Sequence, residues 1–296
     1  MIRRRISNTL RPFFHGLAQR AARAYVVGPD LADAMRVCRS LDAKGLAATV
    51  CAWNGQDDQA ADNAARCLNE IKAIALEKLN CCVSLKAHDL RFSQDLIAQV
   101  ANQARDLNVG IHFDSMGPEA ADQTFSLIDD LRRQNGNVGC TIPSRWARSL
   151  ADAARAAQEG WRVRVVKGQW PDPREPGIDA RANFLRIVDR LAGQAREVAV
   201  ATHDPVLARE ALRRLRATGT TSELELLFGL PLRRTIPVAK ETGVPLRIYV
   251  PYGHAWLPYA IGQVRKNPRI SLWIIRDLLT WGRSELDGLA GGNSGW

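Results

Sequence analysis

The chain has 296 residues, of which 46% are hydrophobic and 24% are charged, an ordinary composition for a globular protein. This length suits one large α/β domain or two small domains. The formal net charge of +10 favours an anionic partner such as a nucleotide cofactor, a membrane surface or nucleic acid. Nucleic acid is not expected, because the sequence has no basic stripe interleaved with stacking aromatic residues and no zinc-finger or RNA-binding signature.

The first 25 residues are basic and amphipathic. Apolar side chains recur at helical spacing beside arginines, at Ile6, Leu10, Phe13, Leu17 and Ala21. A helix with this pattern packs on its own domain or on a partner subunit, which we favour, or it lies on a membrane surface. We expect an N-terminal helical arm over residues 1–44.

The expected compartment is the cytoplasm, with peripheral membrane contact left open by the basic N-terminal segment. No apolar run reaches 18 residues, and the N-terminus lacks the apolar core of a signal peptide. The six cysteines form no C-x-x-C pair, so we interpret them as buried free thiols in a reducing compartment, without disulfides or bound metal.

Short β-rich apolar runs recur along the chain, and their starts lie about 24 to 35 residues apart, the length of one β/α unit. Because they are nearly continuous in apolar residues, we interpret them as strands buried on both faces of a parallel sheet. The eight runs are residues 46–53, 79–87, 108–115, 137–144, 161–168, 196–204, 222–229 and 246–253.

Amphipathic helical stretches separate these runs, and one of them is predicted to begin at Pro205 and to stop at Gly219. Eight strands alternating with helices predict an α/β fold of the (β/α)8 TIM-like barrel type over residues 45–282, followed by a flexible tail at 283–296. A doubly wound open sheet is the alternative, but its G-x-G-x-x-G loop is missing after the first strand. The segment 169–177 is predicted to be a long loop at the barrel mouth.

Active sites of such barrels lie at the carboxyl ends of the strands. Lys86 and Asp114 end neighbouring strands, so an ion pair between them is expected, either functional or structural. Thr202 and His203 precede the helix at Pro205, where a phosphate or ribose could bind. No metal site is expected, because the histidines lack ligand spacing. The full set of strand-end candidates is Lys86, His88, Asp114, Lys167, Gln169, Trp170, His203, Asp204, Glu225, Tyr249 and Tyr252.

Several strings occur together in the order seen in proline dehydrogenases, and the sequence resembles that family over roughly residues 24–270. The strings are V-S-L-K at 83–86, H-F-D-S at 112–115, V-R-V-V-K-G-Q-W at 163–170, A-T-H-D at 201–204, E-L-E-L-L-F-G-L at 223–230 and R-I-Y-V-P-Y-G-H-A-W-L-P-Y at 247–259. Each string falls on a strand that the rhythm of apolar runs had already predicted.

The resemblance implies a distorted (β/α)8 barrel that binds FAD without a covalent bond and passes a hydride from the substrate to flavin N5. It implies catalytic roles on the substrate side for Lys86, Asp114 and Tyr249. Residues expected to contact the flavin are Arg164, Val166, Lys167, Gly168, Trp170, Thr202, His203, Asp204 and Glu225. Residues expected to line the substrate pocket are Gln169, Leu227, Tyr252, Tyr259, Gln263 and Lys266.

The departures from the family pattern concern the substrate. Gly262 and Gln263 stand where the family has an Arg pair that binds the carboxylate of proline, and Lys266 stands where it has Glu. Loss of such a desolvated clamp costs about 2–5 kcal/mol of binding free energy. We therefore expect a substrate other than free proline. Glu225 and Asp204 also replace amides that the family usually has near the cofactor, and this replacement would weaken the affinity for flavin.

The sequence favours an FAD-dependent dehydrogenase or oxidase that attacks a C–N or N–N bond of a small amine or imino-acid-like compound, free or carrier-bound, with a quinone or oxygen as electron acceptor. One alternative is a genuine proline dehydrogenase in which Lys266 or Arg265 reaches the carboxylate. A second alternative is an inactive barrel that serves as a binding or scaffold protein. The oligomeric state is not predicted.

Overall fold

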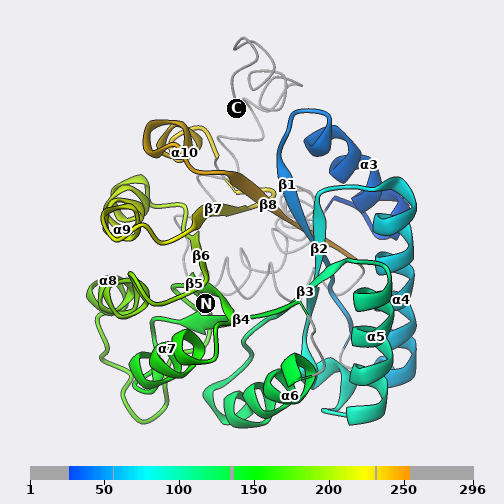
Figure 1. Cartoon of the computed structure of the whole chain (residues 1–296). Helices are drawn as coiled ribbons and strands as arrows, with labels where there is room; N and C mark the ends of the chain where they lie inside the picture. Colours follow the sequence, from blue (N-terminus) through cyan, green and yellow to red (C-terminus); the bar gives the residue numbers. More distant parts are fainter. Residues whose placement is uncertain (1–26, 56, 134–136, 231, 254–296) are drawn as a thin grey trace, which may run out of the picture.

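Eight parallel strands close into a barrel in the computed structural model, which describes residues 27–55, 57–133, 137–230 and 232–253 (Figure 1). The strands follow one another around the barrel in chain order, and β8 pairs with β1 from Ala47↔Arg247 to Ala52↔Tyr252. Each predicted apolar run contains one strand, so the (β/α)8 prediction is confirmed. The strands are β1 Ala47–Ala52, β2 Cys81–Leu85, β3 Gly110–Phe113, β4 Val138–Pro143, β5 Arg162–Val166, β6 Glu197–Ala201, β7 Ser222–Leu227 and β8 Leu246–Tyr252.

Helices surround the barrel on its outside (Figure 1). The helix predicted after Pro205 is α9, which the Asp204 side chain caps by accepting hydrogen bonds from the backbone N–H groups of Val206 and Leu207. The helices are α3 Leu31–Asp42, α4 Ala60–Glu77, α5 Gln94–Asp106, α6 Ala121–Arg133, α7 Ser149–Gln158, α8 Ala180–Leu191, α9 Pro205–Ala217 and α10 Ile236–Thr242, with short 3-10 helices η1 Ala87–Leu90 and η2 Pro118–Ala120.

The apolar core lies between the barrel wall and the helices. Strand residues that face outward, such as Val83 and Phe113, pack with the inner faces of the helices, where Ile71 and Phe184 are fully buried. Burying a side chain of this size contributes about 1.5–3 kcal/mol each. This layer holds the strands in place and leaves the barrel interior free for polar side chains.

The prediction that the strands are nearly continuous in apolar residues is wrong for the side chains that face the barrel interior. In β5, β7 and β8 charged or polar side chains alternate with apolar ones, as in Arg162–Val163–Arg164 and Glu223–Leu224–Glu225. Successive side chains in a strand point to opposite faces, so the charged set faces inward and the apolar set meets the helices.

Several sequence predictions lie outside the described residues. They are the N-terminal helix before residue 27, the tail at 283–296, and the pocket residues Tyr259, Gln263 and Lys266. The described part of the arm is α3, which packs against β1 and β8. None of the described helices is long and apolar enough to cross a membrane.

Candidate functional site

A buried ion network, here called the upper cluster, consists of Arg164, Glu225, Asp114 and Tyr249 in the carboxyl-terminal half of the barrel interior. Arg164 binds Glu225 in a bidentate pair, with Nε–Oε2 at 2.7 Å and Nη2–Oε1 at 2.9 Å. Its Nη1 donates to Asp114 Oδ1 at 2.7 Å. One guanidinium from β5 therefore links the carboxylates of β7 and of the loop after β3.

Tyr249 of β8 completes the upper cluster. Its hydroxyl donates to Asp114 Oδ2 at 2.7 Å, and the Arg164 guanidinium lies 5.2 Å from the centre of its ring. Burial, together with the nearby Asp114 carboxylate, raises the pKa of Tyr249 well above its ordinary value. The phenol is therefore a hydrogen-bond donor at neutral pH, and Asp114 has both oxygens in use.

The charge of Glu225 is compensated inside the protein. Burial alone would raise the pKa of this carboxyl, but the Arg164 guanidinium outweighs that effect and the pKa lies below its ordinary value. Thr49 of β1 also donates to Glu225 Oε1 at 3.0 Å. Glu225 thus supports Arg164, and its charge is balanced by that guanidinium.

The predicted ion pair between Lys86 and Asp114 is wrong. Asp114 pairs with Arg164, whereas the Lys86 ammonium lies 2.9 Å from Cys51 Sγ and 3.2 Å from the carbonyl oxygen of Ala52. The strand ends do bring Lys86 and Asp114 to the same mouth, as predicted. Register alone could not show that a cysteine of β1 lies against both groups.

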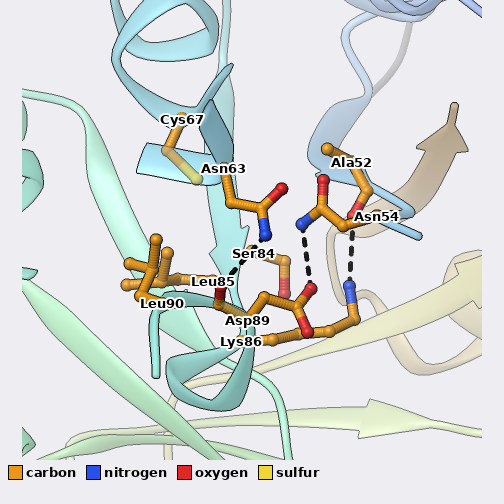
Figure 2. A pocket seen from close by; sticks show the side chains of 9 residues that line it. All are labelled: Ala52, Asn54, Asn63, Cys67, Ser84, Leu85, Lys86, Asp89 and Leu90. Carbon is orange, nitrogen blue, oxygen red and sulfur yellow. Dashed lines mark hydrogen bonds between the residues drawn. The ribbon is translucent and has the colours of Figure 1, made fainter. Parts of the chain in front are cut away.

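A small pocket adjoins Lys86 between the ends of β1 and β2, the first turns of α4, and η1 (Figure 2). Asn54 Nδ2 donates to Asp89 Oδ2 at 2.8 Å, and Asn63 Nδ2 donates to the carbonyl of Asp89 at 2.9 Å. Arg66 donates to both asparagine side chains. This wall holds the backbone that follows Lys86 in a defined position, and sequence reasoning missed it.

The loop after β5 is the long loop predicted at the barrel mouth, and it is tied to the loop after β4. Trp146 Nε1 donates to the carbonyl of Trp170 at 3.0 Å, and the buried Asp172 accepts from the backbone N–H of Ala147 at 3.1 Å. Trp170 itself is 40% exposed. The loop is therefore fastened at the backbone of its exposed tryptophan and again two residues further along the chain.

Gly168, at the start of this loop, has a backbone φ of +85°, and a Cβ there would lie 2.6 Å from the Cβ of Pro143. Both facts require glycine. The peptide at Gly168 consequently presents bare backbone beside Pro143, with Lys167 exposed next to it and Val166 and Gln169 half-buried. Close approach of a ligand to backbone is a common reason for glycine at such a position.

The end of β6 differs from the expectation for a phosphate site. The first N–H groups of α9 are satisfied by the Asp204 side chain, which also pairs with Arg181. Asp204 is therefore a helix cap, and the helix terminus offers these N–H groups to no ligand. His203 Nε2 accepts from the backbone N–H of Leu227 at 3.0 Å, which fixes the ring beside β7.

Two of the predicted pocket residues, Leu227 and Tyr252, lie on different faces of the barrel wall. Leu227 follows Glu225 by two residues and lies on the interior face of β7, as the pocket assignment requires. Tyr252 follows Tyr249 by three residues and lies on the opposite face of β8, towards α4, where Glu70 is a neighbour. The structure therefore does not bring Tyr252 into the barrel, and His88 is exposed on η1.

A second layer of charge, here called the lower cluster, fills the amino-terminal half of the barrel and was missed entirely. Arg162 donates to Glu197 at 2.7 Å and also binds Glu223, which accepts from Arg247 at 2.8 Å. Burial, reinforced by the neighbouring arginines, lowers the pKa of His112 well below its ordinary value, so this histidine is neutral. The alternation of charged and apolar residues in β5, β7 and β8 was the signal that could have revealed both clusters.

Comparisons with known proteins agree with this barrel. No model of a known protein family matches the chain. Proline dehydrogenase 1 of Bacillus subtilis (strain 168) is 25% identical over 276 residues, which cover 87% of this chain and 90% of that protein. Proline dehydrogenase of Deinococcus radiodurans is 27% identical over 150 residues, 48% of either chain.

Solved structures of proline utilization A (PutA) share the fold. The protein from Bdellovibrio bacteriovorus, inactivated by N-propargylglycine, superposes with a TM-score of 0.74 at 15% identity, over 84% of this chain. The protein from Corynebacterium freiburgense superposes with a TM-score of 0.69 at 18% identity, over 93% of this chain. The chain spans about a third of the length of these two proteins, 33% and 34%. The chain is therefore similar to proline dehydrogenases in sequence over most of its length, and it shares its barrel fold with PutA.

Proposed function

We propose that the protein is an FAD-dependent oxidoreductase that oxidises a C–N or N–N bond of a small amine or imino-acid-like substrate other than free proline. The observation that carries this proposal is the upper cluster. It gathers Asp114, Tyr249 and Arg164 inside one end of the barrel, the end at which barrels of this type carry their active sites.

The residues at the ends of β5 and β6 fit FAD in part. Bare backbone at Gly168, the exposed ammonium of Lys167 and the half-buried Thr202 and His203 suit a flat group that bears phosphates. Asp204 does not fit, because its carboxylate already caps α9. We propose that Val166, Lys167, Gly168, Trp170, Thr202 and His203 hold the cofactor, with Arg164 at the flavin edge.

When bound, FAD supplies the acceptor for the hydride at its N5 atom. The chain's own residues orient the substrate. Asp114 Oδ2 and the Tyr249 hydroxyl form a fixed donor–acceptor pair that can hold an amine, and Lys86 offers N–H donors beside them. Since these groups are prearranged by Arg164, catalysis here rests on positioning.

The balance of charge supports a substrate without a strongly bound carboxylate. Among the described charged residues on the interior face at this end of the barrel, Lys86 and Arg164 are balanced by Asp114 and Glu225. Arg164 is bound on both sides by carboxylates, so it offers little attraction to another one. This agrees with the sequence at 262 and 263, where the family's Arg pair is replaced by Gly and Gln.

The test is to purify the protein, record its absorbance spectrum, and follow anaerobic bleaching of the flavin with a panel of cyclic and linear amines that includes proline. Bleaching by a non-proline amine supports the proposal. Bleaching by proline at least as fast as by any other amine would show a genuine proline dehydrogenase. A colourless protein that FAD cannot reconstitute would show a barrel without redox function.

A further inference from the structure

Cys51 lies between Lys86 and Asp114 in the interior of the barrel. It lies on β1 two residues after Thr49, on the same inward face, and it is fully buried. Its sulfur is 2.9 Å from Lys86 Nζ and 3.9 Å from Asp114 Oδ2. The thiol is therefore in contact with a cation on one side and faces a carboxylate on the other.

The thiol is neutral in this place. Burial raises the pKa of Cys51 to about 11, against the opposing effect of Lys86. A neutral thiol accepts a weak hydrogen bond from the ammonium and can donate its own hydrogen towards Asp114 or towards the carbonyl of Ala52 at 3.4 Å. Cys51 thus separates two opposite charges without adding a charge of its own.

The partners of Lys86 and Asp114 show why this separation matters. In the described part of the chain Lys86 has no carboxylate within 4 Å, and its bonds go to a thiol and a carbonyl. Asp114 uses one oxygen for Arg164 and the other for Tyr249. Opposite charges in a site of low effective dielectric constant attract strongly, so Lys86 would move to Asp114 if the space between them opened.

We infer that Cys51 is a positioning residue, which holds the ammonium of Lys86 away from the carboxylate of Asp114 and so preserves the bonds of Asp114 to Tyr249 and Arg164. The relevance of this arrangement to turnover rests on the proposed function, whereas the arrangement itself does not. A shift of about 1 Å in such a site can lower a catalytic rate up to a hundredfold.

The first test is structural and needs no substrate. Crystal structures of the full chain are compared for the wild type, Cys51→Ala and Cys51→Ser, with Cys140→Ala as a control. Cys140 is also a fully buried thiol, but it lies on the outward face of β4. The inference predicts that in Cys51→Ala the Lys86 ammonium comes within 4 Å of Asp114 and that the bond from Tyr249 lengthens beyond 3.5 Å. In Cys51→Ser, whose hydroxyl can still accept, and in Cys140→Ala, Lys86 should stay beside the carbonyl of Ala52.

A second test separates positioning from packing in solution. The double variant Cys51→Ala/Lys86→Met has no ammonium left to move, so Asp114 should keep Tyr249 and Arg164. The hydrogen bond from Tyr249 to Asp114 sets the position of the ultraviolet absorption band of this phenol at neutral pH, which is identified by its loss in Tyr249→Phe. The band should shift in Cys51→Ala and return to the wild-type position in the double variant. Among the described residues, Asp114, Arg164 and Cys51 are charged or titratable neighbours of this phenol, and Lys86 contacts Cys51.

Turnover is measured last, with an amine that bleaches the flavin. The inference predicts a fall in kcat of at least tenfold for Cys51→Ala, and no such fall for Cys51→Ser. It is overturned if Lys86 keeps its place in Cys51→Ala while Asp114 retains both partners, or if the absorption band of Tyr249 is unchanged. If Cys51→Ala fails to fold, the same two readouts on Cys51→Val decide the question. Lack of turnover with every amine would count against the proposed function alone, because the structures and the absorption band do not depend on a substrate.

Discussion

Removal of the Glu225 carboxylate is the perturbation with the largest expected effect on stability. Arg164 and Glu225 are 4% and 2% exposed at their side chains, and Glu225→Ala would leave the Nε and Nη2 groups of Arg164 without acceptors. Removal of one partner of a buried ion pair costs about 3–5 kcal/mol. For a barrel of this size that corresponds to a fall in Tm of about 6–20 °C, at about 2–4 °C per kcal/mol.

The assay is thermal and urea unfolding of Glu225→Ala beside a matched exposed pair. Arg209 and Glu241 have the same bidentate geometry, with Nε–Oε1 and Nη2–Oε2 both at 2.8 Å, but their side chains are 41% and 51% exposed. Glu241→Ala should therefore cost less than about 1 kcal/mol. Equal losses for the two variants would refute the argument that burial makes the Glu225 pair costly to break. In Arg164→Met/Glu225→Leu both charges are removed, so its loss should be smaller than the sum of the single losses.

Three further predictions follow from single side chains. Glu70 is fully buried, neither of its oxygens has a hydrogen-bond partner among the described residues, and burial raises its pKa from 4.5 to about 8. Between pH 4.5 and about pH 8 the folded state holds a proton that the unfolded state has lost, so the free energy of unfolding falls by about 1.4 kcal/mol for each unit by which the pH rises. The gain in Tm from Glu70→Gln should therefore be larger at pH 9 than at pH 5. An equal gain at both pH values would contradict this. Gly168→Ala should lower Tm more than Gly243→Ala. Both glycines have positive φ, but only the Cβ added at 168 meets another atom, the Cβ of Pro143 at 2.6 Å. Similar falls in Tm would show that this contact is harmless. Asp204→Ala should cost about 1 kcal/mol in urea unfolding through loss of the α9 cap, and Arg181→Ala should cost less, since it leaves the cap intact.

The barrel could be predicted because its signals are local. Runs such as 161–168 and 246–253 carry their β-rich character within eight residues, and the α9 start was visible in Pro205. The pairing of neighbours in chain order follows from short right-handed crossovers between parallel strands. The inward direction of Arg164 and Tyr249 was also accessible, since alternation along a strand fixes the face of every side chain.

The partners within the site could not be predicted in the same way. Lys86 and Asp114 were expected to pair because their strands are neighbours, yet Asp114 pairs with Arg164, 50 residues away, and Tyr249, 135 residues away. Thr49 and Glu225, which are 176 residues apart, also meet. Inside a closed barrel an inward-facing side chain can reach across the axis, so its partner depends on register and side-chain direction as well as on adjacency of strands.

The sequence by itself determined the succession of strands and helices, the mouth at which the polar residues gather, and the resemblance to proline dehydrogenases. All three depend on local runs of residues and on short strings. Only the tertiary structure decided that Arg164 is held between two carboxylates, that Asp204 caps a helix, and that Cys51 lies between Lys86 and Asp114. The physical reason is that a buried charge is stable only when it is paired and hydrogen-bonded. Closure of the barrel determines which groups lie close enough to serve as its partners.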